Sequence, residues 1–296
     1  MRNLTMLMDY YELTMSNGYF EKGFKDKMVV FDMFYRKNPD NGGFVVSAGL
    51  EQLIEYIENM HFSKEDIEFL RSKGEFSEGF LQYLADFKFT GNIDALPEGT
   101  ICYPNTPIVT VTAPVIEAQL IETMLLLTMN FQSLIATKAS RICRTAAESG
   151  AVVMEFGARR AHGGDAAILG ARAAYIGGAA ATATVMADER FGVPAIGTMA
   201  HSWIQFFDNE YEAFKAYAEV YPDNCTLLID TYDILNRYDS DMGTASMVFL
   251  EPPSIDQRII GQYSYFSIIP SRIENLQDDT GIETFLDETQ NTVKYI

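Results

Sequence analysis

Phe156-Gly-Ala-Arg-Arg-Ala-His-Gly-Gly-Asp165, followed further along the chain by Gly197-Thr-Met-Ala-His-Ser-Trp203, is the stretch that decides the fold. Each of these polar segments comes directly after a short apolar run, Val152–Glu155 in the first case and Val193–Ile196 in the second. An alanine-rich stretch of helical length lies between them. This order is that of a βαβ unit with polar residues at the carboxyl ends of its strands, where α/β folds place their chemistry. The sequence therefore predicts an α/β fold with a site on these two segments.

The composition excludes two classes of partner. A formal net charge of −19 argues against binding to nucleic acid or to an anionic membrane. The most apolar stretch, residues 120–135, contains Glu122, Asn130 and Gln132, so it is expected to be a buried helix and not a membrane span. Three cysteines, far apart in the chain, form neither a disulfide framework nor a zinc motif. A reducing cytoplasm is therefore the expected location.

Basic residues are concentrated in one window of this acidic chain. Residues 138–172 hold six basic and three acidic side chains. A local basic pocket in an acidic protein suits a small ligand that carries phosphates or carboxylates. The alternative is that these charges are solvated residues on helix surfaces.

The hydrophobic pattern predicts a mixed N-terminal region followed by alternating strands and helices. Before residue 150 we expect a helix that opens with the capping box of Ser63 and Asp66, further helices over 8–24, 49–59 and 116–147, and strands over 28–35, 87–93, 100–102 and 108–112. After residue 150 we expect helices over 165–175, 189–191 and 209–220, and strands over 152–156, 182–186, 195–199 and 226–230.

Four strands with crossovers begin a parallel sheet or a (β/α) barrel. A complete eight-stranded barrel takes roughly 250 residues, so we expect this chain to hold only part of one. Three regions are expected: an N-terminal α+β domain over 1–112, a partial (β/α) barrel over 113–236, and a divergent tail over 237–296.

The two motifs of the opening stretch, together with Asp9-Tyr-Tyr-Glu-Leu-Thr-Met15, resemble those of nicotinate phosphoribosyltransferases, over about residues 4–236. This resemblance implies a barrel of the type II phosphoribosyltransferase kind. It also implies the reaction of nicotinate with phosphoribosyl pyrophosphate to nicotinate mononucleotide and pyrophosphate in NAD salvage, coupled to ATP hydrolysis. From about residue 238 the chain looks instead like a fragment of an FRG domain without its Phe-x-Arg-Gly motif, which leaves a natural fusion, a truncation and an assembly chimera all open.

His201 is the expected catalytic residue. An imidazole at the end of a strand can accept a phosphoryl group and release it again, as a covalent catalyst must. In the family that the chain resembles, this histidine is the one that ATP phosphorylates. Gly197, Thr198 and Ser202 surround it in the sequence and offer hydroxyls or backbone amides to phosphates. The alternative is a structural histidine satisfied by hydrogen bonds.

Arg159 and Arg160 are the expected anion ligands, because a guanidinium makes paired hydrogen bonds with a carboxylate. Arg159 matches the nicotinate-binding arginine of the family, and Arg160 is expected to face phosphate; either could instead pair with a neighbouring acid as scaffold. His162 is expected to keep a hydrogen-bonding role. Tyr11 matches a tyrosine that stacks on the pyridine ring in a neighbouring subunit, so a homodimer is expected, and the alternative for it is a core aromatic.

Four further residues are weaker candidates. Lys138 and Arg141 lie three apart on one helix face and could bind the phosphates of phosphoribosyl pyrophosphate, or could be ordinary surface charges. Asp230 and Asp233 could hold Mg²⁺ or stabilise positive charge on the ribose, or could be structural.

These expectations leave two functions open. One is the phosphoribosyltransferase, with ATP as co-substrate and Mg²⁺ as cofactor. The other is a non-catalytic module that keeps the front half of such an enzyme for binding or oligomerisation. Because barrel enzymes build phosphate sites from the loops after their seventh and eighth strands, the chain as written is expected to form little or no product.

Overall fold

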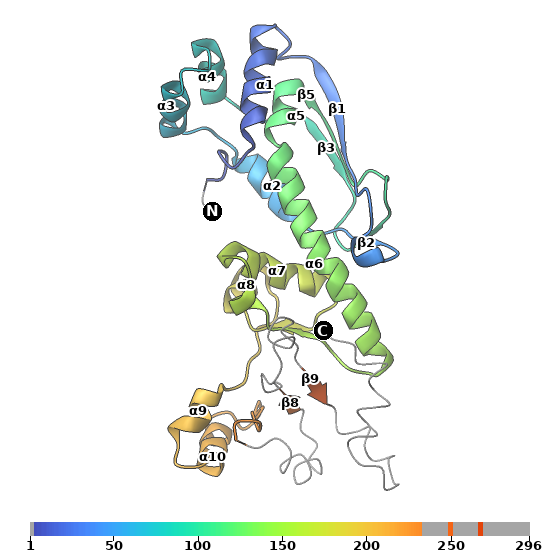
Figure 1. Ribbon diagram of the computed structural model, residues 1–296, viewed down its shortest axis with the longest axis vertical. Helices are drawn as coiled ribbons and strands as arrows, with labels where there is room; N and C mark the ends of the chain where they lie inside the picture. Colours follow the sequence, from blue (N-terminus) through green and yellow to red (C-terminus); the bar gives the residue numbers. More distant parts are fainter. Residues whose placement is uncertain (1–2, 233–247, 251–265, 269–296) are drawn as a thin grey trace. The chain divides into compact units, whose positions relative to one another are not determined.

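The computed structural model describes residues 3–232, 248–250 and 266–268. The chain forms two compact units, Met1–Ala195 and Ile196–Ile296 (Figure 1). The domain boundaries expected at residues 112 and 236 stay predictions. The tail expected over 237–296, with its predicted likeness to an FRG domain, lies outside the described residues except for two short strands, β8 (Val248–Leu250) and β9 (Phe266–Ile268), which pair antiparallel.

The first unit begins with an antiparallel sheet of three strands in the order β1-β5-β3. The strands are β1 (Met28–Met33), β3 (Asn92–Ala95) and β5 (Val109–Pro114). On the central strand β5, Val109, Val111 and Ala113 are buried and alternate with partly exposed residues, as expected for a sheet with one face against the core. The strand expected at 87–93 starts only at Asn92, as β3. Phe87 does not belong to the strand and packs in the hydrophobic core.

Five helices complete the core of this region. They are α1 (Tyr10–Glu21), α2 (Leu50–Asn59), α3 (Lys64–Ser72), α4 (Glu78–Ala85) and α5 (Val115–Leu120). Helices α1 and α5 lie along one face of the sheet (Figure 1), and α1, α4 and α5 contribute Leu13, Phe80 and Ile116 to one buried cluster. The predicted capping box is confirmed: the Ser63 hydroxyl accepts from the Asp66 amide while the Asp66 carboxylate accepts from the Ser63 amide.

The long helix expected over 116–147 is two helices. The helix is interrupted at Ile121, which lies between α5 and the longer α6 (Glu122–Glu148). Helix α6 contacts α2, α7 and β2 (Val45–Val46), which pairs antiparallel with β4 (Ile101–Cys102). A short 3-10 turn, η1 (Pro39–Asn41), also lies against α6 through a hydrogen bond from the Arg141 side chain to the Pro39 carbonyl.

A βαβ unit forms after α6, but its second strand is β7 and not the Val193–Ile196 run of the opening prediction. Strand β6 (Met154–Glu155) is followed by the 3-10 turn η2 (Ala158–Arg160), helix α7 (Gly164–Ile176) and strand β7 (Ala181–Thr182), which is parallel to β6. The 182–186 segment is not a strand throughout, since the chain turns into α8 (Val185–Phe191) three residues after Thr182.

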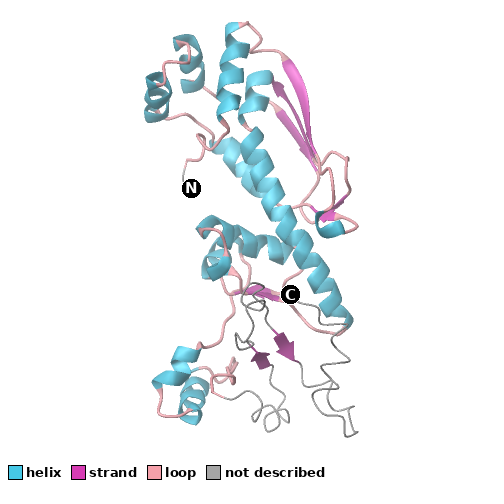
Figure 2. Cartoon of the chain, viewed as in Figure 1, coloured by secondary structure: helices cyan, strands magenta, loops and turns pink. Residues whose placement is uncertain are grey.

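The other two expected strands are wrong. In the 195–199 segment only Ala195 makes a bridge, to Thr182, and Pro194 has no amide hydrogen to add to the ladder. The 226–230 segment is a loop (Figure 2). Its Thr226 carbonyl accepts a hydrogen bond from the Thr198 side chain, where a strand would need a neighbouring backbone.

The second unit also contains α9 (His201–Phe206) and α10 (Glu210–Val220). The Asn209 side chain caps α10 by accepting from the Glu212 amide. The Trp203 indole donates to the Ala213 carbonyl at 3.0 Å, which joins the two helices. The described residues form a mixed α/β structure, with a parallel βαβ unit and without the further strands of a barrel.

Candidate functional site

A pocket of about 290 Å³ lies around the first of the two motifs. Four elements of the first unit supply its walls: α6, the end of β6, the η2 turn with the loop after it, and the first turns of α7. The lining residues are Phe131, Ile135, Glu155, Gly157, Ala158, Arg160, Ala161, His162, Ala166, Ala167 and Gly170. Apolar walls with few polar groups are typical of sites for small aromatic ligands.

Glu155 shapes the loop that carries the two arginines. Its Oε1 accepts from the Gly157 amide at 2.5 Å, and its Oε2 accepts from the Thr182 hydroxyl at 2.7 Å. A Cβ at Gly157 would lie 2.8 Å from the same Oε1, so the tight turn suits glycine here. Glu155 is one of the neighbouring acids that the sequence offered only as a partner for the arginines.

The structure separates the two arginines. Arg160 is half-buried and lines the pocket, whereas Arg159 is exposed and is not a lining residue. His162 is exposed at the rim of the same pocket. After it, Gly163 has a φ of 119°, which allows the chain to turn sharply into α7. Arg160 lines the same pocket as Phe131 and Ile135, and its guanidinium can hold the carboxylate of a flat aromatic acid.

The second motif lies in the second unit and brings His201 together with Asp230. His201 is the first residue of α9; its Nε2 is 3.9 Å from Asp230 Oδ2 and its Nδ1 is 3.1 Å from the Thr231 hydroxyl. The Asp230 side chain is only 2% exposed. A buried carboxylate at this distance stabilises positive charge on the imidazole, which develops when a ring nitrogen takes up a phosphoryl group.

Of the residues near His201 in the sequence, Thr198 makes a structural hydrogen bond, whereas Gly197 and Ser202 are exposed. Thr198 donates its hydroxyl hydrogen to the Thr226 carbonyl at 2.5 Å, which links the His201 segment to the segment before Asp230. Gly197 and Ser202 are exposed, so their backbone and hydroxyl groups are accessible to a ligand. Thr198 therefore has a structural contact that holds this loop.

Basic residues of the 138–172 window do not form one pocket, contrary to the sequence expectation. Arg141 donates to the Pro39 carbonyl at 2.8 Å and forms an ion pair with Asp40 at 3.4 Å. Arg172 is paired with Glu51 and Glu98. Lys138 is exposed on α6 and, like Arg141, is not a lining residue of the Arg160 pocket. Sequence spacing cannot show that distant acids neutralise these bases.

Tyr11 lies on α1 with 43% of its surface exposed, and its hydroxyl donates to Glu122 Oε1 at 2.9 Å. Partial burial, together with this hydrogen bond, raises the pKa of Tyr11 to about 12. The next residue, Glu12, is buried and accepts from the Thr123 amide at 3.0 Å and from its hydroxyl at 2.5 Å. These hydrogen bonds hold the beginning of α1 against the start of α6. The Tyr11 ring is partly exposed, and the hydrogen bond to Glu122 restricts its orientation.

The part of the chain that the structure describes shows neither a cluster of metal ligands nor a membrane-spanning helix. No group of three or more histidine, cysteine, aspartate or glutamate side chains in this part of the chain could hold a metal ion. None of the helices there combines the length and the apolar character needed to cross a membrane. Asp233, the second expected magnesium ligand, lies outside the described residues.

Comparison with known proteins finds that the chain is similar to one kind of enzyme. Residues 6–130 match the model of the nicotinate phosphoribosyltransferase (NAPRTase) N-terminal domain. The chain is 45% identical to nicotinate phosphoribosyltransferase pncB2 of Mycobacterium tuberculosis. The alignment spans 234 residues and covers 79% of this chain and 50% of the relative. It is 46% identical over 233 residues to nicotinate phosphoribosyltransferase of Bacillus subtilis, and this alignment covers 79% of this chain and 47% of the relative. The chain thus spans about half the length of the curated relatives it matches.

Solved structures agree with the sequence relatives. Human nicotinic acid phosphoribosyltransferase is 28% identical with a TM-score of 0.70, over 76% of this chain and 55% of that one. Nicotinate-nucleotide pyrophosphorylase of Pyrococcus furiosus is 25% identical with a TM-score of 0.68, over 85% and 58%. The mixed α/β fold of this chain therefore resembles that of these two enzymes.

Proposed function

We propose that this chain carries the nicotinate-binding and phosphohistidine parts of a nicotinate phosphoribosyltransferase. The reaction joins the ring nitrogen of nicotinate to C1 of phosphoribosyl pyrophosphate and releases pyrophosphate, with ATP hydrolysis coupled through His201. The protein would contribute by positioning the two substrates and by stabilising the charge that develops on the ribose and the pyrophosphate.

The pocket around Arg160 is the observation that carries this proposal. Nicotinate is a flat ring with one carboxylate, and the pocket offers apolar walls with one half-buried guanidinium. The sequence expectation gave the carboxylate to Arg159 and phosphate to Arg160. Because Arg160 lines the pocket and Arg159 is exposed, we propose the reverse: Arg160 binds the carboxylate and Arg159 faces phosphate.

His201 is the proposed phosphoryl acceptor. Its ring nitrogen attacks the γ-phosphorus of ATP while ADP leaves, and transfer of the phosphoryl group to water regenerates the imidazole. Asp230, 3.9 Å from Nε2, stabilises the positive charge on the ring. Gly197 and Ser202 are exposed next to it in the second unit and are the proposed ligands of the ATP phosphates. Lys138, in the first unit, is proposed separately as a ligand of the phosphates of phosphoribosyl pyrophosphate.

Four further parts of the proposal rest on the family likeness. They are a type II phosphoribosyltransferase barrel, a homodimer in which Tyr11 reaches the partner's site, a cytoplasmic location, and Mg²⁺ accompanying the substrate phosphates. Magnesium is commonly held by one or two carboxylates together with phosphates, so a site with no complete set of protein ligands is compatible with it.

Calorimetric binding of nicotinate and of nicotinamide to the full chain tests the proposal. Arg160→Lys keeps the charge but loses the planar pair of donors, so nicotinate affinity should fall by about 1–3 kcal/mol while nicotinamide binding changes little. Arg159→Lys is the matched control, one residue away on the same turn, and should leave nicotinate affinity nearly unchanged. A larger loss in Arg159→Lys would restore the original assignment. Absence of nicotinate binding by the folded wild-type chain would refute the proposed function.

A further inference from the structure

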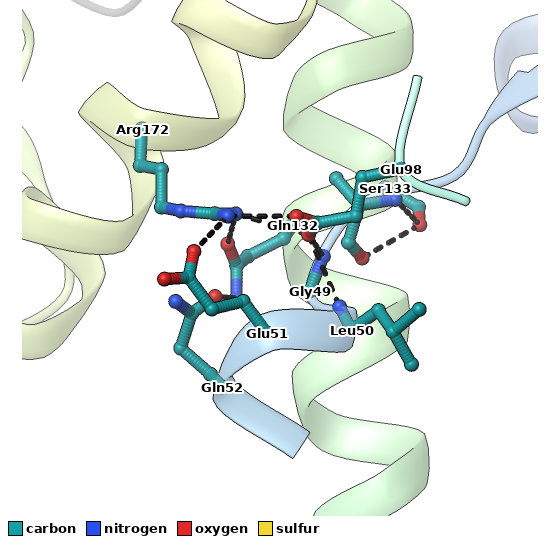
Figure 3. Close-up of polar contacts among 9 residues, drawn as sticks. Gly49, Leu50, Glu51, Gln52, Glu98, Gln132, Ser133 and Arg172 are labelled. Carbon is teal, nitrogen blue, oxygen red and sulfur yellow. Dashed lines mark hydrogen bonds and ion pairs between the residues drawn. The ribbon is translucent and has the colours of Figure 1, made fainter. Parts of the chain in front are cut away.

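Arg172 of α7 is the centre of a buried polar cluster in the first unit (Figure 3). Its side chain is only 10% exposed. The guanidinium makes two parallel hydrogen bonds with Glu98, at 3.0 Å from Nη1 to Oε1 and 2.7 Å from Nη2 to Oε2. Nη2 also pairs with Glu51 of α2, and Nη1 lies 3.4 Å from Gln132 Oε1 of α6. The planar fork of arginine suits this two-pronged contact, and lysine cannot reproduce it.

Glu98 connects Arg172 to the start of α2. Its Oε1 also accepts from the Gly49 and Leu50 amides, at 2.5 and 3.1 Å, so the carboxylate caps α2 while it binds the guanidinium. Gly49 has a φ of 109°, and a Cβ there would lie 2.5 Å from the Thr128 carbonyl of α6. Burial alone would raise the pKa of Glu98, but Arg172 and the two amides outweigh it and lower the pKa below its usual value.

The cluster joins four segments that are distant in sequence. Gln132 Nε2 donates to Gln52 Oε1 at 2.8 Å, and this hydrogen bond links α6 to α2. The loop that carries Glu98, helix α2, helix α6 and helix α7 therefore meet at one guanidinium (Figure 3).

Helix α7 has one face on this cluster and another on the Arg160 pocket. Ala166, Ala167 and Gly170 line the pocket, and Arg172 follows Gly170 by two residues. Two residues correspond to a rotation of about 200° on an α-helix, so Arg172 projects from the opposite face. A shift or rotation of α7 would therefore move the pocket wall and the loop of residues 157–163 that leads into the helix.

We propose that Arg172 and Glu98 are positioning residues: their buried ion pair fixes α7 and thereby holds the 157–163 loop and the wall of the Arg160 pocket. Neither residue lines that pocket, so neither is a catalytic residue. The consequence for nicotinate rests on the proposed function, whereas the position of the loop does not.

The experiment compares Arg172→Met with Arg190→Met in the full chain. Both guanidinium groups lie near the Phe191 ring, at 5.5 and 5.6 Å from its centroid, but Arg190 is exposed. Amide hydrogen exchange is measured in residues 157–163 and in the β1–β5 pair of strands, and nicotinate affinity is measured by calorimetry.

Arg172→Met should accelerate exchange in residues 157–163 by roughly tenfold, the change that corresponds to 1.4 kcal/mol, with the β1–β5 strands unchanged. Nicotinate affinity should fall by a similar factor. Arg190→Met should alter neither. Arg172→Lys keeps the charge, so its loop exchange and its nicotinate affinity should lie between those of wild type and Arg172→Met. If Arg172→Met does not fold, Arg172→Lys is compared with wild type in its place.

Two results would overturn the positioning role. One is unchanged exchange in residues 157–163 in both Arg172 variants. The other is equal acceleration in the loop and in the β1–β5 strands, which would show that the ion pair only stabilises the unit as a whole. If wild-type chain does not bind nicotinate, the proposed function fails, and the exchange measurements still decide the positioning role.

Discussion

Gly177, at the carboxyl end of α7, is the position where a single methyl group should be most informative. It has an ordinary φ of −72°, so the backbone conformation does not require glycine. The neighbouring helix does: a Cβ at Gly177 would lie 2.4 Å from the Ala136 carbonyl oxygen of α6 and 2.7 Å from the Ala139 Cβ. Ordinary contact begins at 3.4 Å, so the overlap with the carbonyl is 3.4 − 2.4 = 1.0 Å.

Gly177→Ala should destabilise the protein by about 2–3 kcal/mol, the upper part of the range for overpacking, because backbone atoms of α6 cannot move aside as a side chain would. Gly170→Ala is the matched control on the same helix. Its Cβ would meet only the Phe131 ring, at 3.9 Å, and alanine inside a helix is favoured over glycine by roughly 0.5–1 kcal/mol. The two substitutions therefore add the same methyl group with opposite expected signs.

Thermal unfolding followed by circular dichroism measures the difference. At about 2–4 °C per kcal/mol for a unit of this size, Gly177→Ala should lower the midpoint by roughly 4–12 °C and Gly170→Ala should raise it slightly. The single tryptophan, Trp203, lies in the second unit, so its fluorescence reports on that unit separately. A Gly177→Ala midpoint within about 1 °C of wild type would refute the close packing of α7 on α6 described above.

Four further outcomes are expected. Burial raises the pKa of Glu12 above its usual 4.5, so its stabilising contribution should be lost as the pH rises from 4.5 through the raised value; urea midpoints should show this decline in wild type and a flatter profile in Glu12→Gln. The lowered pKa of Glu98 has the opposite sign: its contribution is lost as the pH falls below 4.5, and Glu98→Gln should remove that loss. His201→Asn should abolish an acid-labile, base-stable label from radioactive ATP, and a label that persists would exclude His201 as the acceptor. Tyr11→Ala should weaken nicotinate binding about fivefold, from the loss of roughly 1 kcal/mol of stacking, whereas Tyr11→Phe should not; equal effects would point to the hydroxyl.

Local features were predictable because neighbouring residues decide them. The capping box at Ser63 and Asp66 depends on two residues three apart, and it forms as expected. The βαβ order around the Phe156–Asp165 motif also follows from the alternation of apolar runs and a helical stretch, and β6, α7 and β7 form it. The strands expected at 195–199 and 226–230 failed because a strand depends on a hydrogen-bonded neighbour as well as on its own residues.

The sequence by itself determined the two motifs, their place after short apolar runs, and the family that they resemble. Only the tertiary structure decided what each charged side chain does. Arg172 and Glu98 are separated by 74 positions and Arg141 and Asp40 by 101, and no local pattern marks them as pairs. His201 and Asp230 likewise meet only because the chain folds back between them. Packing chooses among many possible partners for a charge, because burial makes an unpaired one costly, and that choice left Arg160 at the pocket and Arg172 in the structural framework.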